Sequence, residues 1–243
     1  MTNTVICAKW GDKYGPEYVN RLYNMVKRNT TKPFKFICFT DNNSGICSEV
    51  ETRELPSMNL PNGKERGWRK LSFFGKDANL SGNVLFIDLD VVIVSNIDDY
   101  FTMEGDFILT EHWKPSKKQG IGQTSVYRFN AANHADLYEY FMANIDTVKA
   151  EYRHEQAYVC GMLAKQNNIK FWPIQWMPSF KYKCMRTFPL NLFMKPVLPK
   201  AAKIVVFHGN PTPDQAMAGK TKGFLKGIFR HVITPQWLKD NWR

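Results

Sequence analysis

Two aspartates stand at the centre of a strongly apolar stretch, and their spacing points to chemistry. Asp88 and Asp90 have hydrophobic neighbours on both sides within residues 84–94. Burying either carboxylate without a partner would be costly. In an extended chain, side chains two residues apart point to the same face, so the two carboxylates should converge. A hard divalent cation would relieve their repulsion. The pattern therefore favours a metal site over the alternative, in which one aspartate caps a turn and the other pairs with a lysine.

A histidine ends a second apolar stretch. His208 follows Val205-Val206-Phe207 and precedes a Gly-Asn-Pro turn. On such a turn a ring nitrogen is exposed and could bind a metal ion. Taken alone, an ordinary surface histidine would explain it better. Taken together with Asp88 and Asp90, it predicts a metal site of two aspartates and one histidine.

These two motifs resemble those of a known enzyme family. The hydrophobic-Asp-x-Asp-hydrophobic pattern resembles the Asp-x-Asp motif of glycosyltransferases with the GT-A fold, and His208-Gly209 resembles the His-Gly segment of retaining members related to glycogenin. The resemblance implies a cation, Mn²⁺ or Mg²⁺, that bridges the two phosphates of a UDP-sugar donor. It makes Asp90 the firmer metal ligand. It also assigns to the donor site Asp88, Leu89, Gly209 and Asn210.

Further donor contacts are implied for residues near the ends of expected strands, where ligands bind in open α/β sheets. These are Ala8, Lys9, Trp10, Tyr14, Thr40 and Asp41. Ordinary turn chemistry explains each of them about equally well. Arg66 and Lys70 share one face of an expected helix and could reach the donor's sugar or phosphates, although a solvated helix end is the simpler alternative. Where relatives carry Lys before Pro-Trp, this chain has Thr212-Pro213-Asp214, so Lys220 or Lys222 would have to supply that charge.

The resemblance also suggests catalytic residues. Relatives carry an acidic or amide residue near the position of Glu155 and Gln156, beside the donor's anomeric carbon. Lys70 would stabilise the negative charge that develops on the departing diphosphate. The His-Gly element favours retention of configuration, whereas an inverting enzyme would need a base, for which Glu155 is the first candidate. The structural alternative for Glu155 is an exposed helix N-terminus, where an acidic side chain is favoured.

Alternating strand and helix patterns predict an α/β protein, with a Rossmann-like GT-A mixed, mostly parallel sheet flanked by helices. Expected strands cover residues 4–8, 34–40, 50–55, 84–94, 106–111, 125–129, 171–177 and 204–207. Expected helices cover residues 16–27, 67–77, 134–151 and 155–166. We predict one GT-A domain over residues 1–219 and a basic, aromatic extension over residues 220–243.

Composition narrows the class of protein. The 243 residues are 44% hydrophobic and carry a formal net charge of +11, which favours acidic partners. Five cysteines without a Cys-x-x-Cys pair suit a reducing cytoplasm. We expect no signal peptide and no membrane span. The basic aromatic extension suits peripheral contact with an anionic membrane at its cytoplasmic face, or else packs its aromatic rings on the domain.

The expected reaction is transfer of a hexose from a UDP-sugar to the hydroxyl of a glycan, glycolipid or protein acceptor, as in polysaccharide biosynthesis. The rival is a metal-dependent nucleic-acid-binding protein or nuclease, because the charge and aromatic residues would also suit a phosphate backbone. Scattered basic residues argue against it, so we expect no nucleic-acid partner. A third interpretation is a non-catalytic sugar- or nucleotide-binding module.

Overall fold

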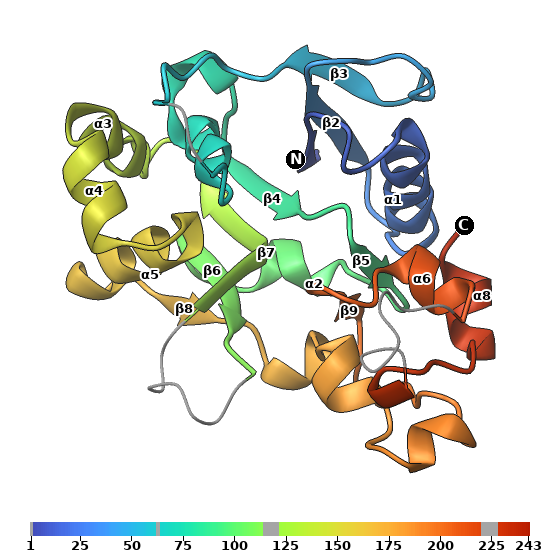
Figure 1. Cartoon of the computed structure of the whole chain (residues 1–243). Helices are drawn as coiled ribbons and strands as arrows, with labels where there is room; N and C mark the ends of the chain where they lie inside the picture. Colours follow the sequence, from blue (N-terminus) through green and yellow to red (C-terminus); the bar gives the residue numbers. More distant parts are fainter. Residues whose placement is uncertain (1, 62–63, 114–121, 220–227) are drawn as a thin grey trace.

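The fold is built around a seven-stranded sheet. The computed structural model describes residues 2–61, 64–113, 122–219 and 228–243, so Lys220 and Lys222 lie outside the described residues. The strand order is β3-β2-β1-β4-β7-β6-β8 (Figure 1). The strands are β1 (Asn3–Lys9), β2 (Phe34–Thr40), β3 (Glu51–Glu54), β4 (Asn83–Ile87), β6 (Phe107–Glu111), β7 (Gly122–Asn130) and β8 (Lys170–Phe171).

The sheet is mixed and mostly parallel, which confirms the predicted fold class. Strands β3, β2, β1 and β4 run parallel to one another, with Cys7 opposite Cys38 in β1 and β2. Strand β7 is antiparallel to both β4 and β6, and β8 returns parallel to β6. The carboxyl ends of the parallel strands therefore lie on the same side of the sheet, where ligands bind in open α/β sheets.

Helices cover both faces of this sheet. Side chains alternate along each strand, so Val5 and Cys7 enter one core and Ile6 enters the other. The first core includes α1; the second includes α3, α5 and the 3₁₀ helix Trp68–Phe74. The helices are α1 (Pro16–Arg28), α2 (Asp99–Thr102), α3 (Ala135–Ala143), α4 (Ile145–Glu151), α5 (Glu155–Lys165), α6 (Pro213–Met217) and α8 (Gln236–Asn241).

The expected strand over residues 84–94 is wrong as a single element. Strand β4 ends at Ile87, the chain turns, and β5 (Val91–Ile93) leaves the main sheet. Asp88 and Asp90 therefore lie in the turn between two strands, not within one. Two carboxylates inside a continuous buried strand would lose their hydration, and a turn at the sheet edge keeps them partly accessible.

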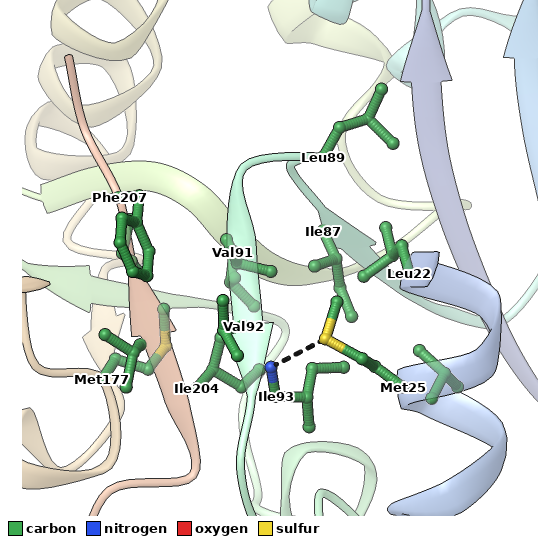
Figure 2. Close-up of a cluster of buried hydrophobic side chains, with 14 of the residues drawn as sticks. Leu22, Met25, Ile87, Leu89, Val91, Val92, Ile93, Met177, Ile204 and Phe207 are labelled. Atoms are coloured by element: carbon green, nitrogen blue, oxygen red, sulfur yellow. Dashed lines mark hydrogen bonds between the residues drawn. The ribbon is translucent and has the colours of Figure 1, made fainter. Parts of the chain in front are cut away.

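Strand β5 pairs instead with β9 (Ile204–Val206) in a separate two-stranded ribbon. Figure 2 shows how this ribbon packs between α1 and Met177, and the dashed line marks the Ile93 main-chain N–H directed at the Met25 sulfur, 3.4 Å away. The ribbon carries the segment after Asp90 and the segment before His208 at the same end. It is thus the element that brings two distant motifs together.

Three other expected elements differ in detail. The helix over 134–151 is two helices, because Asn144 leaves helical geometry and its side-chain amide bonds to the Tyr140 carbonyl oxygen. The strand over 171–177 stops after Phe171, since Pro173 has no N–H to donate. The helix over 67–77 is 3₁₀ and breaks at Gly75, where a Cβ would lie 2.9 Å from the Tyr138 ring.

The described part of the C-terminal extension packs on the domain. Trp242 is only 4% exposed and its ring lies 5.3 Å from that of Tyr18 on α1. Its indole N–H donates to Asp214 at 2.7 Å. Within the described residues, none of the helices combines the length and the apolar character needed to cross a bilayer.

Candidate functional site

A cleft of about 530 Å³ opens at the carboxyl ends of β1 and β4. The segment after β1 forms one wall and the turn after β4 forms another. The residues before and within the 3₁₀ helix Trp68–Phe74 form the third. The lining residues are Ala8, Trp10, Gly11, Asp12, Lys13, Tyr14, Glu65, Arg66, Gly67, Lys70, Asp88, Leu89 and Asp90.

Asp90 is held from the opposite wall. The Tyr14 hydroxyl donates to Asp90 Oδ2 at 2.7 Å. Burial raises the pKa of Asp90 to about 6, and the charge of Asp88 adds to the effect. Burial also raises the pKa of Tyr14 far above its ordinary value, with the Asp90 charge second, so this hydroxyl keeps its proton. The Asp88 carboxylate is therefore close enough to disfavour ionisation of Asp90.

Asp88 is paired with a cation whose side chain is only 12% exposed. Lys70 Nζ donates to Asp88 Oδ1 at 2.6 Å and lies 3.4 Å from the Thr124 carbonyl oxygen. Burial alone would lower the pKa of Lys70, but the charges of Asp88 and Glu155 outweigh it and raise the pKa above its ordinary value. The main-chain N–H of Asp88 donates to the Ser125 carbonyl oxygen at 2.7 Å. The cleft therefore contains a fixed ammonium group beside the acidic turn.

The β5–β9 ribbon carries His208 to the neighbourhood of Asp90. The Phe207 N–H donates to the Asp90 carbonyl oxygen at 3.1 Å, one residue before His208. The imidazole, however, lies 2.7 Å from the Ser179 hydroxyl through Nε2 and stacks on Trp113, with ring centroids 5.0 Å apart. The ring is thus held by contacts outside the 530 Å³ cleft.

The predicted three-ligand cluster is not gathered in this structure. Among the residues that the structure describes, no three His, Cys, Asp or Glu side chains form a group that could hold a metal ion. Asp88 and Asp90 share the cleft, whereas His208 does not line it. The sequence could predict which backbone segments meet, but not the side-chain rotation that pairs His208 with Ser179.

A smaller cavity of about 200 Å³ adjoins the cleft and shares Arg66, Gly67, Lys70 and Asp88 with it. Glu155 lines this cavity although it is only 3% exposed. Its Oε2 accepts from the Thr124 hydroxyl at 3.0 Å, while Oε1 has no hydrogen-bond partner among the described atoms. Burial raises the pKa of Glu155 to about 7, although Lys70 and Thr124 oppose the shift. This carboxyl group can therefore change protonation near neutral pH.

Neighbouring contacts fix the start of α5. The Glu155 N–H donates to the Arg66 carbonyl oxygen at 3.3 Å, and the Arg66 guanidinium donates to the Arg153 carbonyl oxygen at 2.9 Å. Gln156 lines the smaller cavity, and its Nε2 donates to the Gly122 carbonyl oxygen at 3.1 Å. Glu155 and Gln156 therefore sit on a braced helix end rather than on an exposed one.

A third cavity, of about 580 Å³, continues from the cleft at Trp10 and Gly11. Thr40 and Asp41, at the end of β2, line it. Asp41 Oδ2 accepts from the Gly11 N–H at 2.8 Å, and the Thr40 hydroxyl donates to the Asn42 carbonyl oxygen at 2.9 Å. The turn after β1 and the end of β2 are thereby locked together.

Besides His208, three candidates lie outside these cavities. Lys9 is buried, and its ammonium group points to the Asn42 carbonyl oxygen at 3.4 Å. Gly209 adopts φ +76° in the turn after His208, and the Asn210 carbonyl oxygen accepts from Arg230 at 3.3 Å. None of the three lines the cavities described above.

Solved structures give the same architecture. The galactosyltransferase LgtC in complex with donor and acceptor sugar analogs superposes with a TM-score of 0.60 at 10% identity, covering 98% of this chain and 99% of that one. An active-site variant of LgtC gives 0.60 at 12% identity, covering 86% and 89%. The chain has a GT-A glycosyltransferase fold. The glycosyltransferase GlyE of Streptococcus pneumoniae gives 0.59 at 10% identity, covering 87% of this chain and 56% of that one. No family model matches the sequence, and a comparison with curated protein sequences finds no match.

Sequence reasoning missed several residues of this cleft. Asp12, Lys13 and Glu65 line it. The rule that selected Trp10 would also have selected Asp12 and Lys13, because both follow β1 at its carboxyl end. No comparable signal identifies Glu65. No local pattern predicts the hydrogen bond from Tyr14 to Asp90, which lies 76 positions away in the sequence.

Proposed function

We propose that this protein is a metal-dependent glycosyltransferase that transfers a hexose from a UDP-sugar to an acceptor hydroxyl, with retention of configuration. The observation that carries the proposal is the cleft at the carboxyl ends of β1 and β4, where Asp88, Asp90 and Lys70 face the same space. Binding of donor and acceptor sugar analogs by LgtC, which has the same fold, supports it.

The chemistry of the acidic turn suits a divalent cation. Asp88 and Asp90 together offer four carboxylate oxygens, of which one accepts from Lys70 and one from Tyr14. Their mutual repulsion contributes to the raised pKa of Asp90, and a cation would relieve it. His208 would join as a third ligand through rotation away from Ser179. When bound, Mn²⁺ or Mg²⁺ would supply Lewis-acid stabilisation of the diphosphate.

The protein's own groups account for the remaining chemistry. Lys70 is a fixed cation in the cleft, so it would stabilise negative charge as the diphosphate departs. Tyr14 holds Asp90 in one orientation. The walls of Ala8, Trp10 and Tyr14 would contact the nucleoside, and the cavity beyond Trp10 would extend that contact to Asp41.

Glu155 would lie beside the reacting sugar. Its position in the 200 Å³ cavity next to Lys70 and Asp88 supports a role at the donor rather than in nucleotide binding. A pKa of about 7 lets the carboxyl group either donate or accept a hydrogen bond at working pH. In a retaining reaction it would stabilise the oxocarbenium-like transition state, with Gln156 contacting the sugar.

Calorimetric titration of UDP tests the proposal. Wild-type protein should bind UDP with Mn²⁺ and bind it much more weakly without the metal. Asp90→Asn should remove most of the metal dependence. Asp77→Asn is the matched control, because Asp77 is an exposed aspartate outside the cleft. The proposal would be contradicted if UDP did not bind either with or without Mn²⁺. It would also be contradicted if UDP bound equally well without the metal and in the Asp90→Asn variant.

A further inference from the structure

One long stretch of the chain contains no acidic residue. Between residues 156 and 213 there is no Asp or Glu, while eight basic residues supply eight of the eleven net positive charges. These residues are Lys165, Lys170, Lys181, Lys183, Arg186, Lys195, Lys200 and Lys203. Lys165 and Lys203 pair with Glu151 and Asp99 outside the stretch. A surface built from the other basic residues has no acidic neighbour within its own stretch of sequence, so it attracts anionic partners.

The same stretch carries most of the exposed apolar side chains. Among the described residues, ten large hydrophobic side chains are exposed, and nine of them lie between residues 174 and 229. Phe193 is the extreme case at 79% exposure, and Leu190 follows it at 50% within residues 188–197. Single exposed hydrophobic residues are common, but such a concentration on one region marks an interaction surface.

Contacts join two segments of this set, residues 188–194 and residues 228–229. The Phe188 and Phe229 rings lie 5.0 Å apart, and the Asn191 side chain donates to the Ile228 carbonyl oxygen at 2.9 Å. The Met194 N–H donates to the Leu190 carbonyl oxygen at 2.9 Å. We call residues 181–197 together with 228–230 the basic apolar face. Residues 181–197 are drawn in orange, apart from the main sheet, in Figure 1.

From this combination we infer that the basic apolar face docks on the interface of an anionic lipid bilayer. Phe193, Leu190 and Met194 would insert among the upper acyl chains. Lys183 and Lys195 are exposed and long enough to keep their ammonium groups at the lipid phosphates. Each lysine near an anionic membrane contributes about 1 kcal/mol, so the basic residues and the apolar ones reinforce each other.

A bilayer fits this face better than other occupants do. A second copy of the chain packed on it symmetrically would bring the same lysines together without acidic partners. Nucleic acid would match the charge but would leave Leu190, Met194 and Val197 without a role, since base stacking uses aromatic rings. An anionic bilayer satisfies both the charges and the aliphatic side chains.

Most of the basic apolar face lies in residues 181–197, outside the extension over 220–243. The extension was expected to supply the membrane contact. However, Trp242 is buried on the domain, and Trp237 donates to the Pro196 carbonyl oxygen at 3.3 Å. Of the described aromatic residues in the extension, Phe229 is exposed and belongs to the basic apolar face. Phe224 and Lys226 lie outside the described residues.

Vesicle flotation of the full chain tests the inference directly. One set of vesicles contains phosphatidylcholine alone, and the other also contains about a third phosphatidylglycerol. The test variants are Phe193→Ser and the double variant Lys183→Glu with Lys195→Glu. The matched controls are Tyr140→Ser, which removes an exposed aromatic ring on α3, and Lys76→Glu with Lys27→Glu, which makes the same charge change elsewhere.

Wild type should float with the anionic vesicles and stay behind with the neutral ones, and high salt should weaken binding. Each lysine contributes slightly more than about fivefold to the partition coefficient between vesicles and solution. The double variant should therefore lower this coefficient by at least about 30-fold. Phe193→Ser should lower it about tenfold or more. The control variants should match wild type.

Three outcomes would overturn the inference: no flotation with anionic vesicles, equal loss in the control variants, or a concentration-dependent dimer that Phe193→Ser abolishes. The last would assign the face to a second copy of the chain. Flotation requires neither UDP nor metal. A failure to float would therefore not contradict the proposed transferase function, and a failure to bind UDP would not contradict membrane docking.

Discussion

Replacing Glu155 with glutamine should stabilise the protein at neutral and alkaline pH. Glu155 is buried, one of its oxygens lacks a hydrogen-bond partner among the described atoms, and its pKa is raised to about 7. Glutamine has the same shape. Its amide oxygen can accept from Thr124 as Oε2 does, and it never carries the charge whose burial is unfavourable.

The magnitude follows from the two pKa values of Glu155. The ordinary pKa is 4.5 and the folded pKa is about 7, so between these pH values the folded protein binds more protons than the unfolded chain. Stability therefore falls as pH rises through this window, by about 1.4 kcal/mol for each pH unit. The total is about 3 kcal/mol. Glu155→Gln lacks this loss, so its advantage over wild type should grow by about 3 kcal/mol between pH 4.5 and pH 8.

Urea unfolding followed by tryptophan fluorescence at pH 4.5, 6 and 8 measures this difference. Comparing the variant with wild type cancels other titrating groups, Asp90 among them. Glu151→Gln is the control, because Glu151 is exposed on α4 and its replacement should change stability by less than about 0.5 kcal/mol at every pH. If the stability gap between Glu155→Gln and wild type is the same at pH 4.5 and 8, Glu155 does not titrate as its burial implies, and the reasoning fails.

Three further changes follow from contacts in the structure. Tyr14→Phe removes a hydrogen bond that lowers the pKa of Asp90, so an NMR titration of the aspartate carboxyl carbons should show that pKa rising further. Arg128→Met should destabilise the fold by about 3 kcal/mol or more in urea unfolding, because the buried guanidinium satisfies four main-chain carbonyl oxygens. Trp242→Ala should cost about 3–5 kcal/mol in the same assay, since it removes a buried ring and its bond to Asp214.

Local patterns predicted β1, β2 and β6 well because these strands are short and largely apolar. Residues 34–40 form β2 with the expected ends. The sequence pattern gave the wrong element where contacts between distant segments, rather than local hydrophobicity, decide the structure. Residues 84–94 read as one strand, yet the two aspartates end the first strand, and the remainder pairs with β9 more than a hundred residues later. Cross-strand pairing at such a distance leaves no local trace.

The candidate site also combines residues that could be predicted from the sequence with contacts that could not. Asp88 and Asp90 could be selected because carboxylates are unusual in an apolar stretch, whereas Lys70 was selected through the family resemblance. The structure brings all three to one cleft. Side-chain partners could not be selected. The contact of Ser179 with His208 and that of Tyr14 with Asp90 depend on rotamers and on distant segments. Sequence thus indicates which residue types are present, and packing decides which of them meet.

The C-terminal segment bears on how the membrane inference should be tested. The Trp242 ring lies 5.3 Å from Tyr18, whose ring lies 4.7 Å from Tyr14, and Tyr14 holds Asp90. Aromatic packing therefore connects the end of the chain to the acidic turn. Deleting residues after Thr221 would remove Trp242 and disturb the cleft even if those residues never touched a membrane. A truncated protein that loses both activity and vesicle binding would consequently show nothing about docking. Substitutions on the basic apolar face leave these aromatic contacts intact, so they separate the two effects.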